Sequence, residues 1–247
     1  MCTLERRGDL FILTITGNNE HRLNPTLIDS IRAALDRAKT ESESRGPTAL
    51  ITTAHGKFFS NGYDLSWAFS DPETQDQARP KITSKKLRLL VSDLISLPMP
   101  TIAAVTGHAS AAGIILALSH DYLLMRKDRG FLYMSELDIK RKVPNWFMSI
   151  LKSKIGSPRV WRDMVLTAAK ITAETAVEWG IVDSAHDGAE ETVEAAARLG
   201  RDLMKRKWDG ELYADNRRTV FADALAVLGS DETVGDFSGD HKAVSRL

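Results

Sequence analysis

The chain has 247 residues, 43% of them hydrophobic, so it is long enough for one α/β domain with a large buried core. Its 33 basic and 33 acidic residues give a formal net charge of zero, which excludes an overall field that would draw it to nucleic acid or to an anionic membrane. The single cysteine, Cys2, excludes an internal disulfide and a zinc site made of paired thiolates, and it favours a reducing compartment.

No stretch of the sequence has the apolar length needed to cross a bilayer, and residues 1–9 lack the apolar core of a secretory signal. We therefore expect a soluble protein that is not secreted, with neither nucleic acid nor a membrane among its partners.

The first half of the chain alternates short apolar runs with amphipathic segments. The apolar runs predict strands, and apolar residues at helical spacing predict helices that end at Pro or Gly. Such alternation is typical of parallel βαβ units, whose buried strands are apolar throughout. Strands are predicted over 9–16, 48–53, 101–106 and 122–125, and helices from 24–25 towards 46, over 85–97, and from the small residues after 107 to about 120.

Beyond Pro144 the strand signals largely cease and helical patterns dominate. The sequence contains no repeat, no long linker and no low-complexity tract, so one core with a helical extension is favoured over two independent domains. Helices are predicted over 146–154, 158–169, 173–180 and 190–207.

The first candidate functional segment, Lys57 to Leu65 (KFFSNGYDL), comes directly after a predicted strand. Gly62 follows two small polar residues, which permits a turn that presents free backbone N–H groups. Taken alone, a plain turn is the better explanation.

The second segment, Gly107 to Leu116 (GHASAAGIIL), follows another strand and opens a helix. Its small residues would let a ligand approach the main chain, and the N–H groups at a helix start are unpaired and suit a developing negative charge. Taken alone, tight packing of a helix on a sheet is the better explanation.

Together, in this order and at this spacing, the two segments resemble the crotonase (enoyl-CoA hydratase/isomerase) superfamily, and within it the plant-type peroxisomal isomerases. The resemblance runs from the first strand through His21–Pro25 to the helices after Pro158. It implies an α/β fold, a crotonase-type spiral of ββα units ending in helices that mediate the formation of a homotrimer. Residues 1–190 would form the spiral core with the acyl-CoA site, and residues 191–247 the helical region and a tail.

In that family each of the two loops supplies one backbone N–H to an oxyanion hole, and these groups fall at Asn61 and Ala112 of this sequence. The CoA part of the substrate is expected along the first loop and the segment that includes Arg22. The resemblance implies no cofactor besides the CoA of the substrate, and nothing in the sequence suggests a metal site. The predicted substrate-binding residues are Arg22, Leu23, Ser60, Asn61, Gly62, Tyr63, Asp64, Leu65 and Ala112.

Hydratases of the family carry two catalytic carboxylates, and this sequence retains one of the two positions. Ile115 stands where a hydratase has Glu in the second loop, and Ile can neither accept a proton nor orient water. The other position matches Glu136, whose apolar neighbours are expected to raise its pKa into the range of a useful base. The resemblance thus implies a Δ3,Δ2-enoyl-CoA isomerase of fatty acid β-oxidation, in which Glu136 moves a proton from C2 to C4 of a 3-enoyl-CoA.

Three other functions stay open. Hydration and thioester hydrolysis are further crotonase reactions, and Ile115 counts against hydration. A catalytically silent acyl-CoA-binding subunit is the alternative outside enzymes, and Glu136 counts against it.

Other polar residues are weaker candidates for catalysis. His108, His120 and Asp121 could supply a charge pair, but His120 and Asp121 fall where a helix ends, which favours capping and core packing. Asp138 would point away from Glu136 in an extended chain. The run Lys140–Lys142 (KRK) is expected to be a solvated face, and it departs from the apolar or acidic sequence expected in close relatives.

The last three residues, Ser245-Arg246-Leu247, resemble the Ser-Lys-Leu peroxisomal address. The polar residues before them would keep this tripeptide exposed to an import receptor. The alternative is a chance match on a frayed tail, and the interpretation we favour places the protein in the peroxisome.

Overall fold

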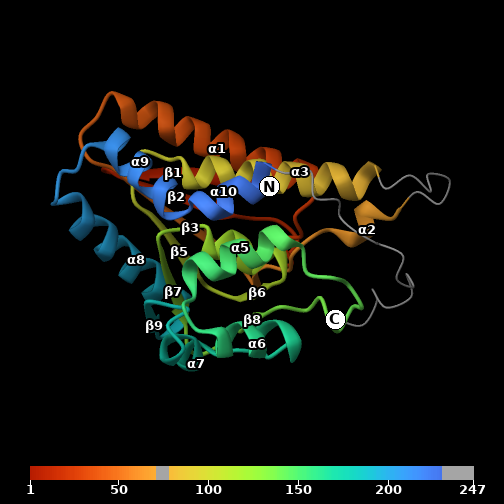
Figure 1. Ribbon diagram of the computed structural model, residues 1–247. Helices are drawn as coiled ribbons and strands as arrows, with labels where there is room; N and C mark the ends of the chain where they lie inside the picture. The colour runs from red at the N-terminus through yellow and green to blue at the C-terminus, as the bar shows by residue number, and fades with distance from the viewer. Residues whose placement is uncertain (71–77, 230–247) are drawn as a thin grey trace.

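A computed structural model of the chain describes residues 1–70 and 78–229 (Figure 1). The tripeptide Ser245-Arg246-Leu247 lies outside the described residues. The core contains a six-stranded sheet in which every neighbouring pair is parallel except the first. Its strands, in spatial order, are β1 (Cys2–Arg7), β2 (Leu10–Ile15), β3 (Ala49–Ala54), β5 (Thr101–Val105), β7 (Tyr122–Arg126) and β9 (Ser184–His186).

The four apolar runs of the sequence form β2, β3, β5 and β7, the buried centre of this sheet, as predicted. The two edge strands were not predicted. β1 pairs antiparallel with β2 and is mostly exposed. Its sequence, CTLERR, has no continuous apolar run, so no strand was predicted there. β9 is a three-residue strand in a part of the chain where only helices were expected.

A second, smaller sheet contains three short parallel strands, β4 (Phe58–Ser60), β6 (His108–Ser110) and β8 (Leu132–Tyr133). Each follows a strand of the large sheet and precedes a helix, so the chain repeats a ββα unit three times. The helices of these units are α3 (Ala78–Ile95), α4 (Ala112–Leu118) and α5 (Asn145–Lys154), with the short α2 (Leu65–Ala68) before α3. This repetition confirms the predicted spiral of ββα units.

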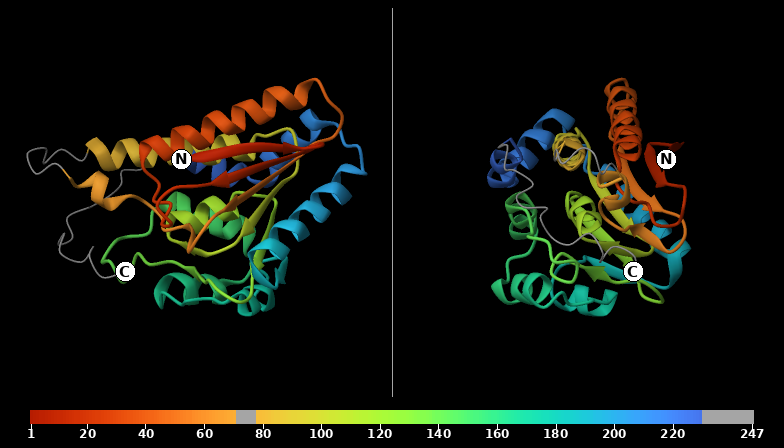
Figure 2. Two further views of the ribbon diagram at one scale, coloured as in Figure 1. Left: turned by 180° about the vertical axis from the view of Figure 1, so that it is seen from behind. Right: turned by 90° about the vertical axis from the view of Figure 1, so that its right-hand side faces the viewer.

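Helices cover both faces of the large sheet. The side chain of Asn24 caps the N-terminus of α1 (Pro25–Glu43), which packs against β1 and lies beside α3 (Figure 1 and Figure 2). α8 (Gly188–Met204) covers the opposite face, where alanines 195–197 pack against Leu10, Ile51 and Ile102.

The remaining helices lie at the ends of the spiral. α6 (Pro158–Leu166) and α7 (Ala173–Glu178) precede β9, and α9 (Gly210–Val220) and α10 (Ala222–Gly229) fold back on α3 and α5. The division expected between residues 190 and 191 falls inside α8, which is packed on the sheet. A division after α8 therefore fits the packing better.

None of the helices in the described parts of the chain is both long enough and apolar enough to cross a membrane.

The arrangement of the small sheet brings the ends of β4 and β6 together. Gly113, in the first turn of α4, packs directly on the main chain of Ser60, because a Cβ atom built at this glycine would collide with the Ser60 carbonyl group. Only glycine fits at this position without moving the backbone. The first turn of α4 is thereby held against the end of β4.

Candidate functional site

The two loops predicted from the sequence meet in the structure. Gly62 has a φ of +73°, and a Cβ built on it would lie 3.4 Å from the backbone N of Ala112. Tyr63 forms a parallel bridge with Leu23, in which the Leu23 N–H donates to the Gly62 carbonyl group at 2.7 Å. The segments around residues 23, 62 and 112 therefore surround one site.

Ala112 is the first residue of α4, and its N–H has no acceptor in the described parts of the chain. Ala111 before it has φ +49° and ψ −120°, a conformation that residues with a side chain rarely adopt. The Ala111 N–H donates to the Tyr133 carbonyl group at 2.8 Å, which fixes this turn. The strained turn leaves the Ala112 N–H available to a ligand.

The first loop requires a correction to the sequence prediction. The N–H of Asn61, the expected oxyanion donor, donates to the Glu20 carbonyl group at 2.8 Å and is therefore already satisfied. The N–H of Tyr63 has no acceptor among residues 1–70 and 78–229. Because Leu23 bonds to the neighbouring groups Gly62 C=O and Asp64 N–H, the Tyr63 N–H lies on the other side of the strand from Leu23. Tyr63 thus replaces Asn61 as the candidate donor.

The sequence contained a partial signal for this donor. Gly62 predicted a turn with free N–H groups, but the residue that carries the free group depends on the Glu20 carbonyl. That carbonyl comes from a distant segment whose register is not visible in the sequence.

Glu136 lies in the turn after β8 and is only 6% exposed. Its Oε2 atom has no hydrogen-bond partner within the described chain. Burial raises its pKa to about 7, and a hydrogen bond from its own backbone N–H opposes the rise. A carboxyl group with this pKa can both accept and return a proton near neutral pH.

Ile115, which the resemblance places at the second hydratase carboxylate, is fully buried in α4 among apolar residues. This position can therefore take no part in proton transfer.

The remaining predicted binding residues have different environments. Arg22 pairs with Glu20 at 2.5 Å, and Asp64 caps α2 through the Trp67 N–H. Ser60 is buried and donates to the His21 carbonyl group at 2.8 Å, so it holds the loop. Leu23, Gly62, Tyr63 and Ala112 lie together, and Leu65 is half-buried at the start of α2.

The comparisons with known proteins agree with this geometry. Residues 12–210 match the enoyl-CoA hydratase/isomerase family model. The chain belongs to this family. It is 54% identical to the peroxisomal enoyl-CoA delta isomerase 1 of Arabidopsis thaliana, over 99% of this chain and 97% of the relative, and 50% identical to peroxisomal isomerase 2 of the same plant, over 95% and 98%. A solved structure of a probable enoyl-CoA hydratase from Mycobacterium tuberculosis has the same fold, with a TM-score of 0.80 at 23% identity over 92% of this chain and 91% of that one.

The two histidines that were weaker candidates for catalysis, His108 and His120, make structural contacts instead. His120 is fully buried, with Nδ1 at 3.0 Å from the Leu116 carbonyl group and Nε2 at 2.7 Å from the Thr52 hydroxyl group. Burial lowers its pKa to about 4, so it stays neutral as a helix cap. His108 packs between the rings of Phe58 and Phe131, with its ring tilted to both.

The acidic and basic candidates are also placed by the structure. Asp138 lies in a turn rather than in an extended segment, and its carboxylate accepts a hydrogen bond from the Tyr133 hydroxyl group. Lys140 and Lys142 are exposed as predicted. The prediction of a solvated face is wrong for Arg141, which is half-buried with its guanidinium 4.7 Å from the centre of the Phe69 ring.

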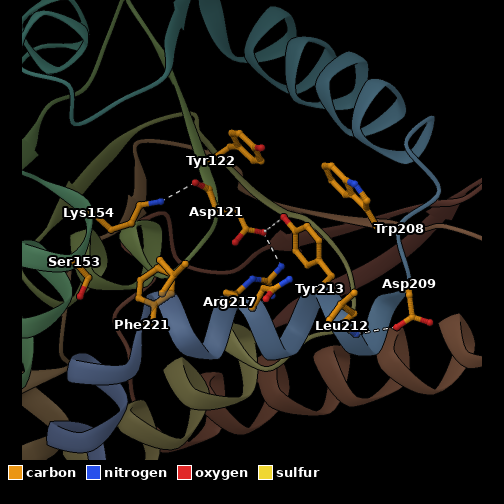
Figure 3. Close-up of a pocket in the computed structure, with 12 residues that line it drawn as sticks. Asp121, Tyr122, Ser153, Lys154, Trp208, Asp209, Leu212, Tyr213, Arg217 and Phe221 are labelled. Atoms are coloured by element: carbon orange, nitrogen blue, oxygen red, sulfur yellow. Dashed lines mark hydrogen bonds and ion pairs between the residues drawn. The ribbon is translucent and has the colours of Figure 1, made fainter.

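A pocket of about 590 Å³ lies between β7, α5 and α9 (Figure 3), and none of the residues proposed for the site lines it. Asp121 connects the walls of this pocket, because its Oδ2 accepts hydrogen bonds from Arg217 at 2.6 Å and from the Tyr213 hydroxyl group at 3.1 Å. Lys154 bonds to the carbonyl groups of His120 and Asp121. These contacts tie α9 to the core, so Asp121 has a structural role.

In residues 1–70 and 78–229, no three His, Cys, Asp or Glu side chains are grouped to bind a metal ion.

The buried state of Glu136 predicts how stability depends on pH. Its pKa is higher in the folded protein than in the unfolded chain, so the folded state binds the proton more tightly. Protonation of Glu136 therefore contributes fully to the stability of the fold below pH 4.5, and this contribution is lost as the pH rises to about 7. Glu136→Gln stays neutral, and its stability relative to wild type should therefore increase between pH 4.5 and 8, by up to about 3 kcal/mol. Urea unfolding at several pH values measures this difference.

Glu178→Gln, which removes an exposed carboxylate on α7, is the matched control and should show no comparable increase. A constant difference between Glu136→Gln and wild type would contradict the raised pKa.

Proposed function

We propose that this chain is a Δ3,Δ2-enoyl-CoA isomerase that converts 3-enoyl-CoA to trans-2-enoyl-CoA in fatty acid β-oxidation. The observation that carries the proposal is that the chain has one buried carboxyl group, Glu136, and an apolar residue, Ile115, at the position of the second catalytic carboxylate of a hydratase. The identity of 50–54% to the Arabidopsis enoyl-CoA delta isomerases supports it.

Isomerisation needs one group that removes a proton and gives it back. The ionised Glu136 takes a proton from C2 of the 3-enoyl thioester, and the electrons of that C–H bond form the dienolate. The resulting carboxylic acid then gives its proton to C4, and the double bond is left between C2 and C3. A pKa of about 7 suits both steps, because neither protonation state of Glu136 is strongly favoured at neutral pH.

The dienolate intermediate carries negative charge on the thioester oxygen. The backbone N–H groups of Tyr63 and Ala112, which have no acceptor within residues 1–70 and 78–229, supply hydrogen bonds to that oxygen. Gly62 lets the two loops approach each other, since its position lies close to the Ala112 nitrogen. Backbone donors need no side chain of defined chemistry, which explains why the sequence has Tyr and Ala at these positions.

The CoA part of the substrate is expected to pass Arg22, Leu23 and the first loop. Arg22 is only partly buried, so its guanidinium can meet a CoA phosphate if it leaves Glu20. The reaction moves a proton within one molecule, so it needs no cofactor besides the CoA of the substrate.

Hydration of a 2-enoyl-CoA, the nearest alternative, requires a second group to orient and activate water. Ile115 offers no lone pair for this purpose.

The reaction predicts the effect of replacing the base. Glu136→Gln keeps size and polarity but lacks the basic lone pair, so kcat for 3-hexenoyl-CoA should fall by about 10²- to 10⁴-fold while acyl-CoA binding changes little. The rise in ultraviolet absorbance as cis- or trans-3-hexenoyl-CoA becomes the conjugated 2-enoyl thioester measures kcat. Calorimetry with a saturated acyl-CoA measures binding.

Asp138→Asn is the matched control, because Asp138 is an exposed carboxylate two residues further along the same turn, and it should keep wild-type kcat. Near wild-type turnover by Glu136→Gln would show that another group is the base.

We extend the proposal to a homotrimer assembled through the C-terminal helices. Apolar side chains of this region are exposed around the pocket of Figure 3: Trp208 is 40%, Leu212 59% and Val220 70% exposed. Exposed apolar groups of this kind mark surfaces that associate. Light scattering should give a mass of about three times the 27.3 kDa of one chain, and a monomer at micromolar concentration would contradict the trimer.

The proposed location is the peroxisome, reached through an import receptor that binds Ser245-Arg246-Leu247. The names of two Arabidopsis relatives include this compartment, and the tripeptide resembles a receptor-read address. A fluorescent protein fused to the N-terminus, which leaves the C-terminal carboxylate free, should label peroxisomes. Removal of the tripeptide should make the fusion cytosolic, and unchanged peroxisomal labelling would disprove the role of the tail.

A further inference from the structure

Tyr63 presents two different groups to the site. Its backbone N–H is the candidate oxyanion donor, whereas its hydroxyl group is buried and has no hydrogen-bond partner of normal geometry in the described chain. Ser84 is the neighbouring side-chain partner of this hydroxyl group, and a buried hydroxyl group that is not fully hydrogen-bonded is costly, so its retention calls for an explanation.

The Tyr63 side chain extends from the first loop towards the helices. Its ring stacks on Phe147 of α5, with ring centres 6.1 Å apart and planes inclined by 27°. Phe147 is almost fully buried. The ring of Tyr63 therefore points towards the interior.

Charged and polar groups surround the hydroxyl. Burial raises the pKa of the Tyr63 hydroxyl above its usual range, with Ser84 and Arg88 of α3 opposing the rise and the charge of Glu136 adding to it. Tyr63 is thus within electrostatic range of both α3 and the candidate base. Its side chain lies between α3, α5 and the space in which Glu136 acts.

The path of the substrate follows from the proposed function, on which this inference rests. The thioester oxygen is held at the N–H groups of Tyr63 and Ala112, and Glu136 must reach C2 and C4. The CoA part leaves on the exposed side, so the acyl carbons beyond C4 continue into the interior. The Tyr63 ring and Phe147 stand on that interior side.

We propose that the side chain of Tyr63 determines which acyl-chain lengths the site accepts. The ring occupies volume that a longer chain requires, and the polar hydroxyl group makes that end of the site less favourable for additional methylene groups. The native enzyme therefore favours short acyl chains relative to an enzyme in which this side chain is smaller or apolar.

The side chain can be changed without loss of the backbone N–H. Tyr63→Phe removes only the hydroxyl group, and Tyr63→Leu also removes the ring. For each variant we would measure kcat/KM for 3-hexenoyl-CoA and 3-dodecenoyl-CoA and compare the ratio of the longer to the shorter substrate. The ratio should rise about threefold or more in Tyr63→Phe and about tenfold or more in Tyr63→Leu, since single methylene groups change discrimination by this order.

Tyr133→Phe is the matched control. Tyr133 is also buried and within electrostatic range of Glu136, but its hydroxyl group is bonded to Asp138, so its loss should leave the substrate ratio unchanged. A ratio within twofold of wild type in a folded Tyr63→Leu protein would overturn the proposal. If that variant does not fold, an unchanged ratio in Tyr63→Phe overturns it equally.

Failure of this inference can be distinguished from failure of the proposed function. If wild type isomerises neither substrate, the proposed function is wrong, and the inference falls with it. If wild type is active and the ratio does not respond to the Tyr63 substitutions, only the role of the side chain is refuted.

Discussion

The close contact between the first turn of α4 and the end of β4 is the constraint on which the candidate site depends. Gly113 lies against the Ser60 carbonyl group, and Gly62 lies beside the Ala112 nitrogen. Because Gly113 has no room for a side chain and Gly62 has a positive φ that favours glycine, the two loops approach at backbone distance. In the described parts of the chain the N–H groups of Tyr63 and Ala112 have no acceptors, so main-chain geometry alone supplies the proposed oxyanion site.

The second requirement of the candidate site is a carboxyl group that is buried away from water. Glu136 follows a two-residue strand, and the turn after it is closed by a hydrogen bond of 2.7 Å from the Arg141 N–H to the Glu136 carbonyl group. Burial of this carboxyl destabilises the folded protein at neutral pH, but the same burial brings its pKa to about 7. The folded protein is therefore less stable at neutral pH than it would be without this buried carboxyl group, but the group can both accept and return a proton.

Much of the fold could be predicted because its centre is apolar. β2, β3, β5 and β7 are continuous hydrophobic runs, whereas β4, β6 and β8 have two or three residues each and give no periodic signal. The location of the site followed from Gly62 and the small residues before Ile114. The choice between Asn61 and Tyr63 as donor did not, because it depends on the Glu20 carbonyl, and contacts between distant segments leave no mark on local sequence.

The position of Tyr63 connects recognition with chemistry. A donor on the backbone places no demand on the side chain of the same residue, so that side chain is free to serve another purpose. Here it reaches Phe147 on α5 and the neighbourhood of Ser84 on α3, two helices that belong to different ββα units. Under the two proposals, one residue therefore contacts the thioester oxygen through its N–H and borders the acyl chain through its ring. Under the same proposals, substitutions at this position change substrate preference while the candidate oxyanion donor, a backbone N–H that every residue except proline possesses, remains in place.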